Sequence, residues 1–330
     1  MKKLLITGGC GFIGHHIVEH FMKVTDWEIV VLDRLSYASS GFNRLRDINV
    51  FDDRRIRTFT ADLTMPLSVG VRDEIGDVDF LFHMAAETHV DNSIKGPEPF
   101  VMSNVVGTMH ILNYAIGIKD LEAFCYFSTD EVFGPAPSGV LYKEWDRYNS
   151  TNPYSATKAG GEELCLAYAN SYRLPLFVVH TMNAFGERQH PEKFIPMCIR
   201  KIIDGEVITI HADRDRQYSG SRFYIHCRNI ANALHFLSDR FTIREKYNIV
   251  GEREVSNLEL ALTIARILGK ELKYEMVDFH SSRPGHDLRY ALDGGKMRGM
   301  GWEVPKTFEQ SLGKTIRWYL ENPIWLRLKH

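Results

Sequence analysis

Short apolar runs alternate with longer amphipathic stretches through the first 180 residues of the chain. The amphipathic stretches repeat their apolar residues at helical spacing, most clearly at 12–24, 97–117 and 154–172. Regular strand–helix alternation is typical of a parallel sheet with right-handed crossovers and helices on both faces. We therefore predict an α/β fold, a doubly wound parallel sheet. Strands are expected at residues 2–7, 28–32, 56–60, 78–83, 123–127 and 176–180.

The pattern changes after Thr181, where longer loops rich in Arg, His, Pro and Asp separate the amphipathic stretches. We expect a first domain over residues 1–180 and a smaller α/β domain over residues 181–330, partly interleaved with the first. The second domain would cover the carboxyl edge of the sheet, where such folds bind ligands. Its helices are expected near residues 195–204, 229–238, 257–268 and 307–319.

The composition is that of an ordinary globular protein, with 44% hydrophobic and 25% charged residues in 330. The formal net charge of -2 leaves no basic excess to neutralise phosphates, which argues against nucleic acids and membrane surfaces as partners. No apolar run is long enough to cross a bilayer, and the opening run stops at Thr7, too early for a secretory signal. Five scattered cysteines indicate reduced thiols in a cytoplasmic protein, and no spacing indicates a metal site.

A glycine-rich turn, Gly-Gly-Cys-Gly-Phe-Ile-Gly at residues 8–14, lies between the first predicted strand and the first predicted helix. In that context Gly8 permits a tight turn, Gly11 lets a pyrophosphate approach the backbone, and Gly14 allows close helix–strand packing. The helix N-terminus then offers free N–H groups to the phosphates. The turn predicts a dinucleotide-binding Rossmann domain.

Asp33 ends the second predicted strand, nineteen residues after Gly14. A carboxylate there accepts hydrogen bonds from ribose hydroxyls and repels a 2′-phosphate, which favours NAD over NADP. Arg34 is the opposing feature, because a guanidinium at this position also suits a phosphate. Asp62, after the third strand, is equally compatible with a bond to the adenine amine and with an ordinary turn.

Tyr154 and Lys158 are four residues apart in a helix that Asn152 can cap and Pro153 can start. They therefore share one helix face. An ammonium one turn away, helped by a cationic nicotinamide ring, would lower the pKa of the phenol and let it act as a base. A chance pair on a surface helix is the alternative.

The strand at 123–127 becomes polar abruptly at Ser128. Thr129, Asp130 and Glu131 follow, at the edge where open parallel sheets bind ligands. Further along, Arg222 and Arg283 lie in loops, and their planar forks suit phosphate oxygens. Surface salt bridges are the alternative for both arginines, but their position in loops favours a diphosphate site.

Six motifs fit one known family and lie at residues 7–14, 85–91, 128–134, 152–158, 191–196 and 283–287. With them the chain resembles, over essentially its whole length, the extended short-chain dehydrogenase/reductases. Within these it resembles the nucleotide-sugar 4,6-dehydratases of the dTDP-glucose 4,6-dehydratase type. The glycine turn and the Tyr154–Lys158 pair mark only the superfamily. The Asp130–Glu131 pair and the Arg-Pro-Gly-His-Asp loop at 283–287 are more selective.

The resemblance implies a bound NAD that oxidises C4 of a nucleotide-activated glucose, loss of water across C5–C6, and hydride return to C6. Tyr154 would take the C4 hydroxyl proton, with Lys158 lowering its pKa and Thr129 donating a hydrogen bond to the same oxygen. Glu131 would remove the C5 proton as base, and Asp130 would protonate the leaving C6 hydroxyl as acid. Elimination needs an acid and a base together, so two carboxyl groups are required.

The resemblance also implies two sets of binding residues and a homodimer. The cofactor set is Gly8, Gly11, Phe12, Ile13, Gly14, Asp33, Arg34, Ser36, Asp62, Leu63, Ala85, Ala86, Thr88, Asn104, Tyr154 and Lys158. The substrate set is Thr88, Val90, Asn183, Lys193, Arg222, Asn257, Arg283 and His286. The dimer would form through the helix at 97–117 and the helix that begins near Tyr154, packed as a four-helix bundle.

Departures from the family pattern leave the base and the sugar open. Residues 183–186 read Asn-Ala-Phe-Gly where dTDP-glucose enzymes usually read Asn-Asn-Tyr-Gly, and Asn92 replaces the usual Arg. The loop at 210–220, beside the nucleobase in relatives, is longer and more basic than usual. We predict dTDP-glucose as the first choice of substrate and UDP-glucose as the next.

Two other functions stay open. A 4-epimerase or a decarboxylase on the same scaffold is expected to lack Asp130. A non-catalytic NAD-binding sensor is expected to lose Tyr154 or Lys158. This chain keeps all three residues.

Overall fold

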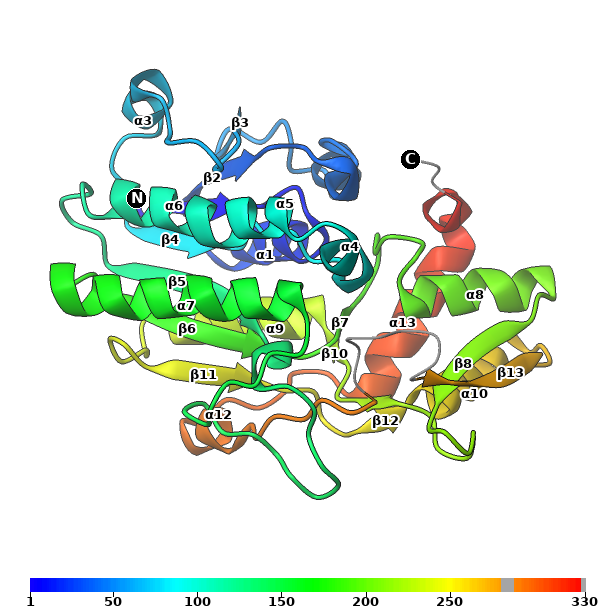
Figure 1. The fold of residues 1–330 in the computed structure, drawn as a ribbon. Helices are drawn as coiled ribbons and strands as arrows, with labels where there is room; N and C mark the ends of the chain where they lie inside the picture. Colours follow the sequence, from blue (N-terminus) through cyan, green and yellow to red (C-terminus); the bar gives the residue numbers. More distant parts are fainter. Residues whose placement is uncertain (280–287, 328–330) are drawn as a thin grey trace.

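A seven-stranded parallel sheet forms the centre of the protein in the computed structural model, which describes residues 1–279 and 288–327 (Figure 1). The strand order is β11-β6-β5-β4-β1-β2-β3, so the direction of winding reverses between β1 and β4. This order confirms the predicted doubly wound α/β fold. The strands are β1 (Lys3–Thr7), β2 (Glu28–Asp33), β3 (Ile56–Thr60), β4 (Phe80–His83), β5 (Ala123–Thr129), β6 (Leu176–Thr181) and β11 (Lys246–Ile249).

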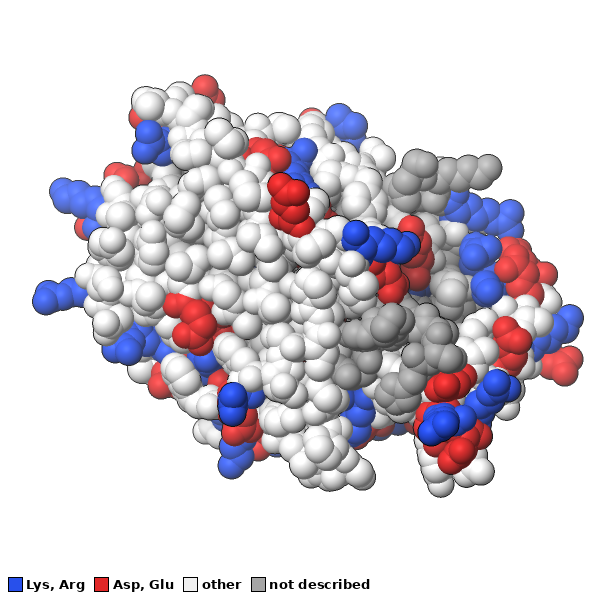
Figure 2. All heavy atoms as spheres, in the orientation of Figure 1, with Lys and Arg blue, Asp and Glu red and all other residues white. Residues whose placement is uncertain are grey.

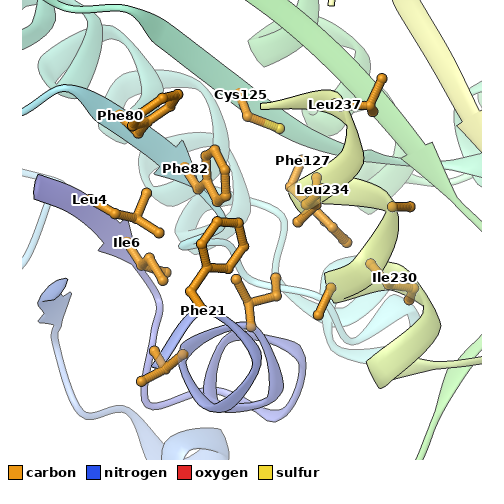
Figure 3. Packing of buried hydrophobic residues seen from close by; sticks show 14 of the residues in the cluster. Leu4, Ile6, Phe21, Phe80, Phe82, Cys125, Phe127, Ile230, Leu234 and Leu237 are labelled. Atoms are coloured by element: carbon orange, nitrogen blue, oxygen red, sulfur yellow. The ribbon is translucent and has the colours of Figure 1, made fainter. Parts of the chain in front are cut away.

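Helices cover both faces of the sheet because successive strand residues point to opposite sides. Leu4 and Ile6 of β1 belong to the apolar core shared with α1 and α9, whereas Leu5 belongs to the core shared with α6 and α7. Figure 3 shows the first of these cores, with Phe21 of α1 beside residues of the sheet and of α9. The longer helices are α1 (Phe12–Val24), α6 (Gly107–Ala115), α7 (Pro153–Tyr172), α8 (Phe194–Asp204), α9 (Cys227–Leu237), α10 (Asn257–Leu268) and α13 (Phe308–Glu321).

A second apolar core lies beside the carboxyl edge of the sheet. It is built from α8, α10 and α13, which pack around the parallel pair β8 (Ile208–Ala212) and β13 (Tyr274–Asp278). The helices were predicted at these places, but the two strands were not. In Figure 1 this part stands to the side of the main sheet, joined to it by β7 (Ala184–Phe185) and β10 (Ile225–His226).

The sheet also receives residues from the second half of the chain. Strand β11 pairs in parallel with β6, and α9 packs against α1 beneath the sheet. The sequence pattern indicated α9 but not β11, whose residues Lys-Tyr-Asn-Ile lack an apolar run. The sheet of the first domain therefore includes an element from beyond residue 181.

The helix predicted at 97–117 is continuous but not uniform. It comprises α5 (Glu98–Val101), a π-helical turn η2 (Met102–Val106) and α6. The remaining short elements are η1 (Tyr37–Ser39), α2 (Asn43–Asp47), α3 (Val69–Ile75), α4 (Val90–Lys95), η3 (Asp130–Phe133), β9 (Ser221–Arg222), β12 (Val255–Ser256), α12 (Gly295–Gly299) and η4 (Pro323–Leu326). Within residues 1–279 and 288–327, no helix combines the length and apolarity needed to cross a membrane.

Candidate active site

A cavity opens at the carboxyl edge of the sheet, where β1, β2, β4, β5 and β6 end. Most of the residues predicted from the sequence line this one space. They are Gly8, Gly11, Phe12, Ile13, Gly14, Asp33, Arg34, Ser36, Asp62, Leu63, Ala85, Ala86, Thr88, Thr129, Asp130, Glu131, Tyr154, Lys158, Asn183 and Lys193. The fold thus brings together residues that lie far apart in the sequence.

The glycine-rich turn forms a cradle that side chains would fill. Gly8 has φ +75°, and a Cβ atom there would lie 2.9 Å from the backbone nitrogen of Ala85. A Cβ atom on Gly14 would lie 2.3 Å from the carbonyl oxygen of Gly8. No side chain caps the N-terminus of α1, so its first N–H groups stay available to an anion. These features fit the pyrophosphate of a dinucleotide.

Asp33 is held in place beside this turn. Its carboxylate accepts hydrogen bonds from the backbone nitrogens of Cys10, at 3.0 Å, and Leu35, at 2.8 Å. Burial nevertheless raises the pKa of the carboxyl group. Each oxygen keeps a lone pair for a ribose hydroxyl, which fits the predicted role of Asp33.

The charge of Arg34 is balanced by two carboxylates. Its guanidinium forms an ion pair with Glu87 and lies 3.9 Å from a carboxylate oxygen of Asp62. A paired guanidinium has less attraction for a further phosphate, so the feature that could have favoured NADP is weakened.

In the acidic pair after β5, Asp130 is buried and Glu131 is half-buried, and hydrogen bonds hold both. Thr129 donates a hydrogen bond to Asp130 Oδ1 at 3.0 Å, and Asn152 Nδ2 donates to Glu131 Oε2 at 3.2 Å. Asp130 Oδ2 is buried and has no hydrogen-bond partner among the described residues. An unsatisfied buried carboxyl oxygen in a cavity is costly unless a ligand group completes it.

Burial raises the pKa of both carboxyl groups. The pKa of Asp130 is raised to about 6, although Arg222 and the Thr129 hydrogen bond oppose the rise. The pKa of Glu131 is raised to about 7, first by burial and then by the neighbouring charge of Asp130. Near neutral pH the pair therefore holds roughly one proton, and its two protonation steps belong to the pair.

Tyr154 and Lys158 face the same cavity from α7, whose N-terminus is capped by Asn152 as predicted. Burial lowers the pKa of Lys158 to about 7, and its ammonium lies 4.3 Å from the centre of the Tyr126 ring. The expected lowering of the Tyr154 pKa is not present in this structure. Burial, Glu131 and Asp130 raise that pKa, while the hydrogen bond from Thr129 lowers it. Burial of the phenol is the main cause of the raised pKa, and the acidic pair adds to it.

Four other predicted residues lie outside the lining of the cavity. Asn104 is buried behind it, where its amide bonds both backbone groups of Glu87 at 2.8 and 3.0 Å. Val90 packs against Phe100 and Tyr154. Arg222 lies 4.7 Å from the ring centre of Tyr290, and Asn257 accepts a hydrogen bond from Tyr224 at 2.7 Å. Arg283 and His286 lie outside the described residues.

Several lining residues were not predicted as site residues. They are Leu32, Ala38, Ser39, Arg44, Ala61, Met84, Ser103, Phe127, Ser128, Thr181, Met182, Ala184, Gln189 and His190. Those next to strand ends, such as Ser128 and Thr181, could have been found by extending each strand to its polar end. Arg44 carried no such signal, because it lies in a polar segment with no motif.

Comparison with known proteins places these features in context. The model of the NAD dependent epimerase/dehydratase family matches residues 4–250. A dTDP-glucose 4,6-dehydratase of Salmonella typhimurium is 36% identical over 347 residues, covering 98% of this chain and 94% of the relative.

Two further proteins have similar sequences or structures. A trifunctional UDP-glucose 4,6-dehydratase/UDP-4-keto-6-deoxy-D-glucose 3,5-epimerase/UDP-4-keto-L-rhamnose-reductase of Arabidopsis thaliana is 34% identical over 328 residues, covering 98% of this chain and 48% of the relative. The crystal structure of a dTDP-glucose 4,6-dehydratase from Streptomyces venezuelae, with NAD and TYD bound, superposes with a TM-score of 0.88 at 34% identity. That match covers 98% of this chain and 99% of the other.

Proposed function

The chain belongs to the NAD dependent epimerase/dehydratase family, and we propose that within it the protein is an NAD-dependent nucleotide-sugar 4,6-dehydratase, a hydro-lyase. Its substrate is a nucleotide-activated glucose and its product the 4-keto-6-deoxy sugar. The observation that carries the proposal is the pair of Asp130, which is buried, and Glu131, which is half-buried, beside Tyr154 in one cavity. Elimination of water needs a proton donor and a proton acceptor together, and the pair supplies both.

Bound NAD would supply the hydride acceptor for C4 and the hydride donor for C6. Gly8, Gly11, Gly14 and Asp33 would hold its pyrophosphate and adenosine ribose. The chemistry of this chain's own residues begins with Tyr154, which as a phenolate takes the proton of the C4 hydroxyl while Thr129 donates a hydrogen bond to that oxygen. The phenolate would be favoured by Lys158 and by the cationic nicotinamide ring, against the effect of burial. The ketone that forms at C4 makes the C5 hydrogen more acidic.

Glu131 then removes the C5 proton, and Asp130 gives a proton to the departing C6 hydroxyl. The raised pKa values support a pair that shares one proton near neutral pH, but they do not divide the roles, because the higher pKa belongs to Glu131. Their assignment as base and acid follows the family pattern. Lys158, one helical turn away, is proposed to stabilise the phenolate of Tyr154 with its positive charge.

The substrate would lie across the cavity toward the second apolar core. Thr88, Asn183 and Lys193 line the cavity on that side and are proposed to contact the sugar nucleotide. The names of the relatives include a dTDP-glucose and a UDP-glucose dehydratase, so either thymidine or uridine is a candidate for the nucleoside of the substrate. We propose dTDP-glucose as the first candidate and UDP-glucose as the second.

The test is mass spectrometry of products after the purified protein is incubated separately with dTDP-glucose, UDP-glucose and UDP-N-acetylglucosamine. A product lighter by one water from one substrate supports the dehydratase and identifies the base. An isomer of unchanged mass would instead establish the alternative, a 4-epimerase. A separate incubation with UDP-glucuronic acid tests the other alternative, because loss of carbon dioxide from it would establish a decarboxylase.

We further propose that two chains associate through α5, η2, α6 and α7 as a four-helix bundle. Figure 2 shows few charged side chains on the face over α6 and α7. Val101, at the end of α5, and Met102, at the start of η2, are 43% and 37% exposed.

The five cysteines are buried free thiols, which supports a cytoplasmic location. We also propose the division into an NAD-binding domain, residues 1–180, and an interleaved nucleotide-sugar domain, residues 181–330.

A further inference from the structure

Arg44 is a buried cation in the wall of the cavity. Its side chain is only 1% exposed, and it is among the largest fully buried residues of the described chain. It lies in the short helix α2 and lines the same cavity as Gly11, Phe12 and Asp33. No carboxylate of the described residues lies within ion-pair distance of its guanidinium. A buried charge without an ionic partner needs another source of compensation.

Part of that compensation comes from four backbone carbonyls. Nε donates to the carbonyl oxygen of Arg188 at 3.1 Å, and Nη1 donates to that of Cys10 at 3.2 Å. Nη1 also donates to the carbonyl oxygens of Ala38 at 2.8 Å and Ser39 at 2.7 Å. Nη2 has no acceptor among the described residues. Since Arg44 lines the cavity, Nη2 is the donor group left for a ligand.

The position of this donor matches a phosphate group. Nη1 is bonded to Cys10, the centre of the glycine-rich turn that begins α1. The segment 8–14 holds no Lys or Arg, and burial keeps the adjacent His15 neutral by lowering its pKa. Burial lowers the pKa of Arg44 only to about 10, so the guanidinium stays charged at neutral pH. Arg44 is therefore a charged guanidinium in direct contact with the turn.

We propose that Arg44 positions the cofactor, with Nη2 donating to a pyrophosphate oxygen of NAD. The other donors hold the glycine turn, the loop after β2 and the loop at 186–190 around that contact. An arginine is suited to this because its planar fork carries five donors in fixed directions, whereas a lysine offers three donors from a single atom. The proposal rests on the NAD-binding part of the proposed function and is independent of the dehydration chemistry.

The experiment is calorimetric titration of the nucleotide-free protein with ADP, adenosine and 2′-AMP. Arg44→Met removes the donor, and Arg188→Gln is the matched control. Arg188 is a neighbouring buried cation whose side chain bonds Asp47 and does not line the cavity. We expect Arg44→Met to weaken ADP binding about tenfold to a hundredfold and adenosine binding less than about twofold. Arg188→Gln should leave the ADP-to-adenosine ratio unchanged.

The ratio separates a phosphate contact from a structural role. A variant that weakens ADP and adenosine equally would show that Arg44 only holds the loops, and would overturn the proposal. A loss confined to 2′-AMP would assign the contact to a 2′-phosphate and overturn it as well. If Arg44→Met does not fold, Arg44→Lys is expected to weaken ADP more than adenosine. Failure of the wild-type protein to bind any of these would contradict NAD binding itself.

Discussion

Asp130 and Glu131 are neighbours in the chain, but their carboxyl groups have different hydrogen-bond partners. Glu131 is held by the amide of Asn152, whereas Asp130 Oδ2 has no partner among the described residues. Asp130 is buried and Glu131 is half-buried beside Tyr154, so two full charges there are unfavourable. The pair consequently keeps one proton over a narrow range of pH, and that range should govern the rate.

The first prediction concerns the pH dependence of kcat/KM. Below about pH 6 both carboxyl groups are protonated and no base is present, and above about pH 7 both are ionised and no acid is present. We therefore expect a bell-shaped profile with its maximum near neutral pH, measured by product formation at constant ionic strength. A rate that stays constant from pH 5 to 9 would contradict the shared proton.

The second prediction separates the acid from the redox chemistry. Asp130→Asn keeps the shape of the side chain but removes its proton, so dehydration should slow by about a hundredfold to a thousandfold. Oxidation at C4 does not need this acid, so reduced nicotinamide should still form and accumulate, as measured by its absorbance. Glu144→Gln is the control, because Glu144 is buried but bonds Asn248 away from the cavity. Loss of nicotinamide reduction in Asp130→Asn would contradict the assigned role.

The sequence predicted these residues because each belongs to a local motif at a strand end or a helix start. Arg44 was beyond its reach. The carbonyls that hold it come from Cys10, Ala38, Ser39 and Arg188, and the last lies 144 residues away. Only the folded chain brings these groups together. A lone arginine in a polar segment looks in sequence like an exposed one.

Secondary-structure elements were likewise predicted where the signal is local in the sequence and missed where it is not. The strands of the first half were predicted because their own residues are apolar, and Ile56–Thr60 was placed to the residue. Strand β11 was missed because it includes Lys246 and Asn248, both buried. The partners that offset the cost of burying these polar residues are distant in sequence. Lys246 lies 2.9 Å from the carboxylate of Glu162 in α7, and Asn248 bonds His180 in β6 at 3.0 Å.

The third prediction tests this buried ionic network. Glu162 is fully buried, and His180 and Lys246 together lower the pKa of its carboxyl group. Glu162→Gln would leave the Lys246 charge buried without its counter-charge, and we expect the free energy of unfolding to fall by roughly 3–5 kcal/mol. Glu163→Gln, the exposed neighbour on the same helix, should change it by less than about 0.5 kcal/mol. Urea denaturation measures both, and equal effects would contradict the network.

At the scale of the whole molecule, buried histidines link the fold to pH. Burial lowers the pKa of His83 to about 3 and those of His16 and His20 to about 4. His16 lies at the junction of α1 with α9 and the loop after β7, where its Nε2 lies 3.1 Å from the Glu187 carbonyl. These histidines are neutral in the folded protein at neutral pH, whereas the unfolded chain binds their protons below about pH 6.5.

The fourth prediction follows from that difference. Because the unfolded state binds more protons at these histidines, their contribution to the free energy of unfolding should fall as the pH is lowered from about 6.5 to about 4. The raised pKa values of Asp130 and Glu131 act in the opposite direction, so the contribution of a histidine is measured as the difference between the wild-type protein and its variant. Each additional proton bound on unfolding contributes about 1.4 kcal/mol per pH unit. Denaturation midpoints at several pH values measure the slope. His83→Gln, where His83 contacts Thr7 and Thr108, should reduce the slope, and an unchanged slope would exclude His83 as a source.

The fifth prediction concerns the charge-poor face formed by α5, η2, α6 and α7. Apolar side chains that stay exposed in a single chain are stabilised when a second copy covers them, and Val101 of α5 and Met102 of η2 are exposed. A charged residue there costs little in the monomer but must be buried in the dimer. We expect Val101→Lys combined with Met102→Lys to convert a dimer to a monomer in sedimentation velocity, without lowering the denaturation midpoint of the monomer. Leu262→Lys is the control, because Leu262 is 49% exposed on α10, in the second core. A double variant that sediments like the wild-type dimer would exclude this face, and a wild-type monomer would exclude the bundle altogether.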